Sequence, residues 1–269
     1  MTDVLGVCTA WGDGVCVVTP DSGGLPVTIR IADIVSGKPV PPRPSPRLRV
    51  SPREAQVRGL ALFPDLDVVE VPGPSGWLLR SSATATARRA NSVLAFSSGP
   101  FGPDEVSAVV GHYSALGKRP VAAVLGASDE RDFLTGLGWV LESHDADTLF
   151  QLASVAAVRR ALSAVDASAV ELSVDGALLS ATIPGVAQGF AAYAEDWVGV
   201  RGIGIASEHR RQGIARLIMA ALLKWAAELG ATTAYLQVLG DNEPALALYE
   251  GLGFTTHHQY AYLTRPGGR

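Results

Sequence analysis

The sequence has few cysteines, few aromatic residues and no long apolar run, and each shortage excludes a class of protein. Among 269 residues there are only two cysteines, Cys8 and Cys16, which cannot supply a disulfide framework or a four-cysteine zinc site. No apolar stretch reaches 18 residues, and Met1 is not followed by the basic and apolar regions of a secretory signal. We therefore expect a cytoplasmic protein without a membrane partner.

The charge balance gives no general attraction toward nucleic acid. Lysine and arginine number 22 against 26 acidic residues, which gives a net charge of −4, and no basic stripe with interleaved aromatic residues is present. Apolar residues make up 48% of the chain and charged residues 18%, with 29 glycines, which is typical of a loop-rich globular protein. The sequence predicts no nucleic-acid partner and leaves the oligomeric state open.

Proline and glycine divide the chain into three predicted parts. Short apolar runs separated by glycines in residues 4–31 predict the strands of a small barrel or meander. Five prolines within residues 38–49 predict an extended linker and a boundary near residue 48. Helices and strands then alternate up to residue 152, with a strand predicted over residues 139–143, and several strands followed by helices come after it. The predicted domains are residues 1–48, 49–152 and 153–269.

The most informative stretch, residues 202–216, joins an apolar strand to an amphipathic helix that begins near Gly213. A helix start presents unpaired N–H groups and the positive end of the helix dipole, and Arg210, Arg211 and Arg216 add charge to it. The stretch lacks the Lys-Ser/Thr of a P-loop and the Gly-x-Gly-x-x-Gly of a dinucleotide site. It predicts a pyrophosphate-binding loop, with a solvated Arg-Arg turn as the alternative.

Two motifs resemble those of the GNAT superfamily of N-acetyltransferases. The acyl-CoA loop of that superfamily, Gln/Arg-x-x-Gly-x-Gly/Ala, is matched by Arg210-Arg211-Gln212-Gly213-Ile214-Ala215. Its second segment, Asn-x-x-Ala-x-x-Leu-Tyr-x-x-x-Gly-Phe, is matched at Asn242, Ala245, Leu248, Tyr249, Gly253 and Phe254. The resemblance covers about residues 171–264. It implies an α+β fold with a mixed, mostly antiparallel sheet flanked by helices.

The resemblance also implies acetyl-CoA as cosubstrate and an amine as acceptor. No metal is expected, because His257 and His258 have no thiolate or carboxylate pair nearby. Two neighbouring strands are expected to splay apart, and Tyr249 is expected to protonate the departing thiolate as general acid. The alternative for Tyr249 is a core tyrosine packed on Phe254. The residues that the resemblance assigns to acetyl-CoA are Ile203, Gly204, Ile205, Arg210, Arg211, Gln212, Gly213, Ile214, Ala215, Arg216, Asn242 and Ala245.

No general base is assigned. Some GNAT enzymes carry a glutamate in the strand before the second segment, but Gln237 stands there in this sequence and cannot take a proton. The remaining candidates are Glu195 and Asp196 in a predicted turn, and His257 with His258 beyond the second segment. A water chain or an amine that is already neutral serves equally well.

A second resemblance lies in the first half of the chain. Residues 76–80 and 88–92 are similar to GNAT proteins in which a degenerate GNAT-like half precedes the active one, with a small barrel in front. This implies two GNAT-like halves here. Arg89, Asn91 and Ser92 then either line the acceptor cleft or form a structural turn.

The predicted function is transfer of an acetyl group from acetyl-CoA to a primary amine of a small molecule or a protein. The alternative is a non-catalytic acyl-CoA-binding sensor or interaction module. Both bind acetyl-CoA, so release of the CoA thiol in the presence of amines separates them.

Overall fold

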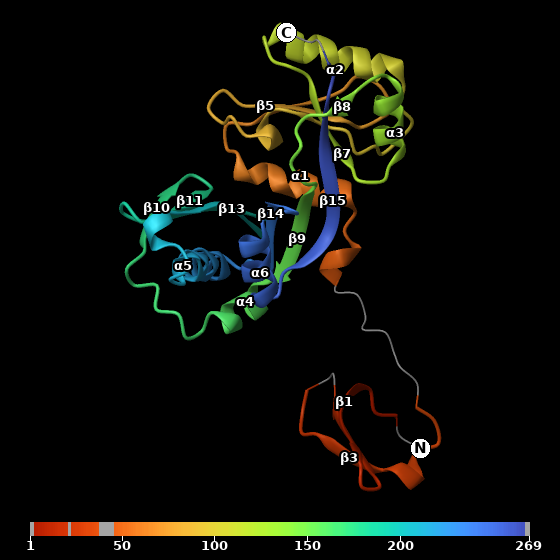
Figure 1. The fold of residues 1–269 in the computed structure, drawn as a ribbon, viewed down its shortest axis with the longest axis vertical. Helices are drawn as coiled ribbons and strands as arrows, with labels where there is room; N and C mark the ends of the chain where they lie inside the picture. Colours follow the sequence, from red (N-terminus) through yellow and green to blue (C-terminus); the bar gives the residue numbers. More distant parts are fainter. Residues whose placement is uncertain (1–2, 21–22, 38–45, 267–269) are drawn as a thin grey trace. The chain divides into compact units, whose positions relative to one another are not determined.

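The structure, a computed structural model, describes residues 3–20, 23–37 and 46–266 (Figure 1). Contacts within the chain divide it into two compact units, residues 1–44 and 45–269. Most of the predicted proline-rich linker, residues 38–45, lies outside the described residues. In the described part of the chain, no helix combines the length and apolar character needed to cross a membrane.

The first unit is a three-stranded antiparallel sheet, which confirms the small strand-rich segment predicted in front of the two halves. Its strands are β1 (Gly6–Gly12), β2 (Val15–Pro20) and β3 (Val27–Arg30), in the order β1-β2-β3. Asp13 and Gly14 both have positive φ in the turn between β1 and β2, as a tight hairpin requires. Cys8 and Cys16 are free thiols whose Sγ atoms lie 3.6 Å apart across these two strands.

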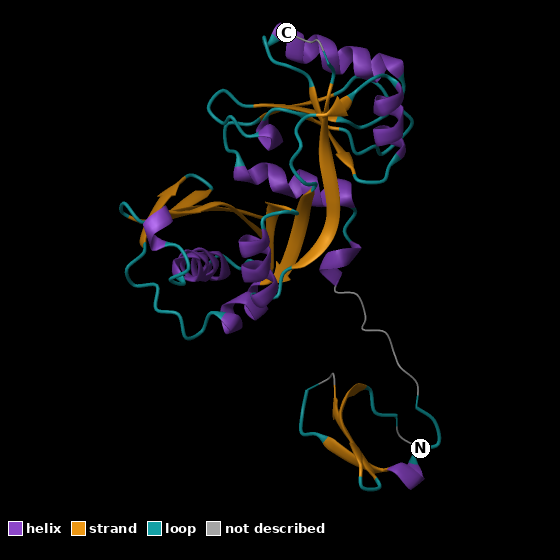
Figure 2. Ribbon diagram, viewed as in Figure 1, coloured by secondary structure: helices purple, strands orange, loops and turns teal. Residues whose placement is uncertain are grey.

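The second unit contains two halves that share one sheet (Figure 2). The elements of its first half, in chain order, are α1 (Pro52–Arg58), the 3-10 turn η3 (Gly59–Leu62), β4 (Asp67–Glu70), β5 (Leu78–Ser81), the 3-10 turn η4 (Arg88–Ala90), β6 (Val93–Leu94), α2 (Pro103–Ala115), β7 (Val121–Leu125), α3 (Asp129–Gly136) and β8 (Val140–Leu141). Strand β6 runs parallel to β7, and α2 connects them. The other strand pairs of this half are antiparallel.

The second half repeats this plan on a larger scale. The last strand of the first half is β9 (Thr148–Ser154), and the elements of the second half are α4 (Val155–Ala161), β10 (Glu171–Asp175), β11 (Leu178–Ile183), β12 (Ala187–Ala194), β13 (Trp197–Ile205), the 3-10 turn η5 (Ser207–His209), α5 (Ile214–Glu228), β14 (Thr233–Leu239), α6 (Glu243–Gly251) and β15 (Thr255–Thr264). Strands β13 and β14 are the parallel pair here, and α5 connects them. Both halves therefore have a parallel strand pair bridged by a helix, followed by a second helix and a last strand.

The two halves exchange their last strands. The sheet order is β10-β11-β12-β13-β14-β9-β15-β7-β6-β5-β4, with β8 beside β15. Strand β9 lies between β14 and β15, so the first half supplies a strand to the second. In return, residues 260–264 of β15 pair with β7. Figure 1 shows β15 as the long blue strand that runs from one half into the other.

The ends of α3 and α6 show the repeat in the sequence itself. Residues 136–139 read Gly-Leu-Gly-Trp, and residues 251–254 read Gly-Leu-Gly-Phe. The second glycine of each run has positive φ, 82° in the first half and 86° in the second, and the following aromatic N–H donates to a helix carbonyl over 3.0 Å. In the first half that carbonyl belongs to Leu134, and in the second to Tyr249.

Residues of the central strands alternate between two cores. Val198 and Leu236 pack beneath α5, in a cluster that includes Leu222. Trp197 and Tyr235 point to the other face, where the α1–η3 segment covers them. This alternation is what the two-residue period of a strand produces when helices cover both faces.

Most predicted elements are present, but one predicted strand is wrong in extent and four strands were not predicted. The fold class is confirmed: the sheet is mixed, mostly antiparallel and flanked by helices. The predicted strand over residues 139–143 is wrong in extent, because only Val140 and Leu141 pair with β15. Strands β4, β6, β9 and β10 were not predicted. The predicted boundary at residue 152 stays a prediction, and this residue lies inside β9.

Candidate functional site

The site begins where β13 and β14 part. These parallel strands pair only from Trp197–Val200 to Thr233–Leu236, so the ends of both strands beyond this point are unpaired with each other. Gly202, with φ of 64°, lies in an irregularity of the β12–β13 pairing that bends β13. The divergence leaves backbone groups of β13 open to a ligand, as the predicted splay requires.

A cleft of about 930 Å³ fills this split. Its size is in the range of ligand pockets. The predicted residues Ile203, Gly204, Ile205, Arg210, Arg211, Gly213, Ile214, Ala215, Arg216, Asn242, Ala245 and Tyr249 all line it. Residues that were not predicted and that also line it are Ala87, Arg88, Thr148, Gly202, His209, Val238, Leu239, Pro244, Leu248 and Tyr262. Two further residues complete the lining. Arg89 was predicted either to line the acceptor cleft or to form a structural turn, and Gln237 stands where some GNAT enzymes carry a glutamate.

At one end of the cleft, the loop before α5 presents unpaired amides. The N–H groups of residues 211–215 make no backbone hydrogen bond within the described chain. Arg211 and Gly213 both have positive φ, 60° and 77°, which turns successive amides toward one side. Helix α5 has no side-chain cap and no acidic residue in its first turn. Such a helix start is suited to bind an anion.

The charged side chains of this loop are arranged in different ways. Arg210 Nε donates to the Ile205 carbonyl over 3.3 Å, and Arg216 Nη2 donates to the Ala161 carbonyl over 2.8 Å. Arg211 is exposed, and the described residues offer its guanidinium no hydrogen bond or ion pair. Gln212 does not line the cleft, because its Nε2 donates to the Glu208 carbonyl over 3.2 Å. Gln212 was predicted to bind acetyl-CoA, and only its backbone amide is open for such binding.

Helix α6 supplies the opposite wall. Asn242 Oδ1 accepts from the Ala245 amide over 3.3 Å, so Asn242 caps the helix as well as facing the cleft. Tyr249 is buried, and its ring lies 5.8 Å from that of Phe254 in an edge-on arrangement. Burial raises the pKa of the Tyr249 hydroxyl, and the positive charge of Arg89 partly opposes this. Tyr249 thus packs on Phe254 and also lines the cleft, and its role as general acid stays a prediction.

Among the residues that the structure describes, no carboxylate lines the cleft. Glu195 and Asp196 lie in the turn between β12 and β13, where both form ion pairs with Arg58. Gln237 accepts a short hydrogen bond from the Tyr260 hydroxyl. The structure therefore gives none of the acidic candidates a place beside Tyr249.

His257 and His258, both on β15, form a row of hydrogen bonds with Gln56 and Val50 and do not line the cleft. Gln56 Nε2 lies 3.1 Å from His258 Nε2, the two Nδ1 atoms of His257 and His258 lie 2.7 Å apart, and His257 Nε2 donates to the Val50 carbonyl over 2.7 Å. Burial lowers the pKa of His258 to about 3, and the neighbouring His257 adds to this effect. His258 is therefore neutral at pH 7.

The segment of residues 88–92 divides between the two predicted roles. Asn91 is structural: its Nδ2 donates to the Ala85 carbonyl over 2.7 Å, and its Oδ1 accepts from Lys118. Ser92 is also structural, because its Oγ accepts from buried Arg80 over 2.8 Å. Arg89 instead lines the cleft. In the described residues, no group of three or more histidine, cysteine or acidic side chains is placed to hold a metal.

Comparison with solved structures defines the class of protein. A GCN5-related N-acetyltransferase from Kribbella flavida superimposes with a TM-score of 0.59 at 20% identity, over 80% of this chain and 95% of that one. A tandem GNAT protein from the clavulanic acid biosynthesis pathway superimposes with a TM-score of 0.51 at 12% identity, over 80% and 88%. The fold is therefore the GNAT fold, with two GNAT-like halves.

Sequence comparisons agree. Residues 142–263 match the family model described as "Probable histone acetyltransferase Rv0428c C-terminal". The "Uncharacterized N-acetyltransferase YobR" of Bacillus subtilis (strain 168) is 32% identical over 76 residues, which are 28% of this chain and 31% of the relative, so the alignment spans about a third of that protein. Residues 142–263 are therefore similar to an acetyltransferase family, and the chain has the GNAT fold.

Proposed function

We propose that this protein is an acetyl-CoA-dependent N-acetyltransferase that acetylates a primary amine. The observation that carries the proposal is the cleft itself, which joins unpaired helix-start amides, exposed β13 backbone and the Tyr249 hydroxyl in one space. The amides and Arg211 bind the pyrophosphate, and the backbone of Ile203 and Ile205 pairs with the pantetheine arm. Asn242 and Ala245 form the wall opposite this arm.

Tyr249 acts as the general acid. Because burial raises its pKa, the hydroxyl keeps its proton at neutral pH and is able to donate it. As the amine nitrogen forms its bond to the acetyl carbon, the carbon–sulfur bond breaks and Tyr249 gives its proton to the sulfur. The proton lost by the amine restores the tyrosine, so acetyl-CoA and amine yield the acetamide and the CoA thiol.

The absence of a carboxylate from the cleft is compatible with this chemistry. An amine attacks only in its neutral form, and positive side chains around it lower its pKa and favour that form. Arg89 supplies such charge from η4. The cleft therefore assists deprotonation electrostatically, with water receiving the proton as the amine enters.

The second candidate, an acyl-CoA-binding module without turnover, is favoured by the glutamine at position 237, where a base is expected. One experiment tests both. Calorimetric titration of CoA measures binding, and a thiol assay with acetyl-CoA and a panel of primary amines measures turnover. Binding with thiol release supports the transferase, binding without release supports the module, and no binding contradicts both. The predicted cytoplasmic location stays a prediction.

A further inference from the structure

The cleft contains a strong excess of positive charge within an acidic protein. Its described lining includes Arg88, Arg89, Arg210, Arg211 and Arg216 but no aspartate or glutamate, although the chain as a whole carries a net charge of −4. The loop at residues 210–216 accounts for the cations needed by a pyrophosphate. Arg88 and Arg89 lie in η4, which belongs to the first half of the unit, and their presence in the cleft needs a separate explanation.

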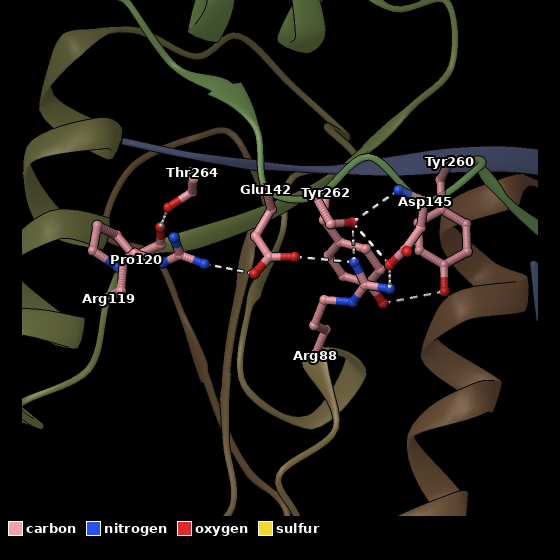
Figure 3. A network of polar contacts seen from close by, with 9 residues as sticks. Arg88, Arg119, Pro120, Glu142, Asp145, Tyr260, Tyr262 and Thr264 are labelled. Carbon is pink, nitrogen blue, oxygen red and sulfur yellow. Dashed lines mark hydrogen bonds and ion pairs between the residues drawn. The ribbon is translucent and has the colours of Figure 1, made fainter. Parts of the chain in front are cut away.

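Arg88 is already neutralised. Its Nη1 donates to Glu142 over 3.0 Å and its Nη2 donates to Asp145 over 3.1 Å, so carboxylates flank the guanidinium (Figure 3). The guanidinium also lies 4.8 Å from the centre of the Tyr262 ring. These contacts fasten η4 to the segment after β8 and to β15. They hold the next residue, Arg89, at the cleft.

Arg89 has no such partner. Its Nη1 atom is buried without a hydrogen bond, and no ion pair to its guanidinium is found among the described residues. A buried guanidinium nitrogen without an acceptor is costly, because desolvation is not repaid. Other cations lie near it as well. Burial lowers the pKa of Arg80 and of Arg201, and the charge of Arg89 lowers both further.

Arg89 lies at the reactive end of the cleft. Its charge acts on the hydroxyls of Tyr235, Tyr249 and Tyr262, whose burial-raised pKa values it lowers. Tyr235 belongs to the last stretch over which β13 and β14 pair. From there to the end of β13 at Ile205 the strand extends about 16 Å at about 3.3 Å per residue. The α5 loop at that far end binds the pyrophosphate, whereas Arg89 faces the place where the amine reacts.

We propose that Arg89 binds a carboxylate carried by the amine acceptor, so that the acceptors of this enzyme are amino acids or similar amines with an acid group. The proposal rests on the proposed acetyltransferase function. A carboxylate offers two oxygens to the two terminal nitrogens of the Arg89 guanidinium, so that the buried Nη1 gains an acceptor. Its negative charge also offsets the repulsion of Arg89 by Arg80 and Arg201. A lysine side chain in a basic peptide would instead bring more positive charge to this end of the cleft.

The test uses amines in matched pairs that differ only in the acid group. Glycine is compared with methylamine, phenylalanine with phenethylamine, and a lysine-rich peptide and phosphoethanolamine are added. We expect kcat/KM to be higher for the carboxylated member of each pair. Arg89→Gln should lower kcat/KM for these acceptors about 10- to 100-fold, chiefly through KM, and should shrink the preference within each pair. Arg89→Lys, which keeps the charge but not the fork, should lie between them.

Two controls separate this proposal from a structural role and from failure of the proposed function. Arg159→Gln makes the same chemical change at an exposed position on α4 outside the cleft and should alter none of these values. CoA affinity, measured by calorimetry, should be the same in Arg89→Gln as in the wild type. Loss of CoA binding in the wild type contradicts the proposed function and not the role of Arg89.

A binding measurement decides the role of Arg89 even if no amine in the panel is acetylated. Glycine and phenylalanine should raise the melting temperature of the CoA-bound wild type more than methylamine and phenethylamine do, and this difference should vanish in Arg89→Gln. Equal effects of the variant on both members of each pair overturn the proposal. So does a wild type that prefers the lysine-rich peptide or phosphoethanolamine.

Discussion

The two halves share one topology but differ at the start of the helix that bridges their parallel strands. In the first half, the Gly102 amide before α2 donates to Glu105 over 2.8 Å, and the nearby Ser97 amide donates to Glu130 over 2.8 Å. In the second half, α5 starts with open amides and has Arg216 at the position that Glu105 holds on α2. A helix start that carries its own carboxylate has no need of an external anion.

A second difference lies at the helix that follows. The Gly-Leu-Gly-aromatic runs align Leu134 of α3 with Tyr249 of α6. Leu134 is fully buried in the core of the first half, whereas Tyr249 faces the cleft. The comparison teaches that the first half keeps the scaffold while its ligand positions are filled by the protein itself. In addition, the first half supplies β9, which pairs with β14 and β15, and it places Arg89 at the cleft.

The largest effect should come from removing the hydroxyl that distinguishes α6 from α3. Tyr249→Phe keeps the packing on Phe254 but takes away the proton donor, so we expect kcat to fall roughly 100- to 10,000-fold. Thiol release measured with acetyl-CoA and an accepted amine checks this, and CoA affinity should change little. Tyr193→Phe, which removes a hydroxyl outside the cleft, serves as the control. Unchanged turnover in Tyr249→Phe would remove the tyrosine from the chemistry.

The next effect should come from making α5 resemble α2. Arg216→Glu places a carboxylate at the third residue of the helix, where Glu105 stands in the first half. The carboxylate should satisfy the open amides and repel a pyrophosphate, so we expect CoA affinity to fall about 100-fold and the melting temperature to rise. Calorimetry and thermal unfolding measure the two changes. Arg216→Gln separates loss of the arginine from gain of the acid, and equal losses in both variants would contradict the capping argument.

A matched pair of glycines tests the loop with a smaller effect. Gly213 and Gly138 have φ of 77° and 82°, and a Cβ at either would meet no atom within 4 Å. Alanine at either position should therefore cost about 1 kcal/mol of unfolding free energy through backbone strain alone. Only Gly213→Ala should also weaken CoA binding, about tenfold, because only that glycine shapes the open amides. If Gly138→Ala weakened CoA binding equally, the effect would be general destabilisation.

The smallest effect concerns the strand that both halves share. His258 on β15 occupies the position that Ser143 holds in the first half, counted from the Gly-Leu-Gly runs. Its pKa is about 3 in the folded protein and near 6.5 when unfolded, so the unfolded chain binds more protons between these values. Acidification from pH 7 to 5 should therefore lower the unfolding free energy by at most ~1.4 kcal/mol per pH unit.

Urea unfolding at pH 7, 6 and 5 measures this slope. The window excludes Asp65, whose pKa is lowered to about 2 chiefly by the Ser82 and Thr84 hydroxyls, because that carboxyl is ionised throughout it. His258→Gln keeps hydrogen-bonding groups but does not titrate, so its unfolding free energy should depend less on pH. Parallel pH profiles of the two proteins would show that His258 does not carry the effect.

The sequence predicts most strands and helices of the second half well because the signals are local, whereas phosphate binding by the loop before α5 stays a prediction. Glycine and arginine before an amphipathic helix, and Asn242 and Tyr249 at fixed spacing, lie within short segments whose chemistry is readable in order. Strand β9 was missed because it is buried on both faces and shows no alternation, and it leads directly into α4. The repeated Gly-Leu-Gly-aromatic run is visible in the sequence, and it would have aligned Leu134 with Tyr249.

The surroundings of Arg88 and Arg89 at the cleft were less predictable. Arg88 and Arg89 are neighbours in the chain and chemically identical, yet one is paired with Glu142 and Asp145 and the other has an unpartnered nitrogen. This difference depends on contacts with residues more than fifty positions away, which no local pattern records. The same holds for the histidines, whose burial depends on Gln56 and Val50 from α1 and the segment before it.

The shared strands also set an order of events during synthesis. Strand β15 follows every other described strand in the chain, and it supplies the neighbour of β7. Until β15 has been synthesised, the nascent first half has an open, apolar strand edge, which is a template for wrong pairing. Translation of β15 therefore completes both halves at once, and a messenger that stops short of β15 would yield an aggregation-prone product even though the preceding strands of the first half are all encoded.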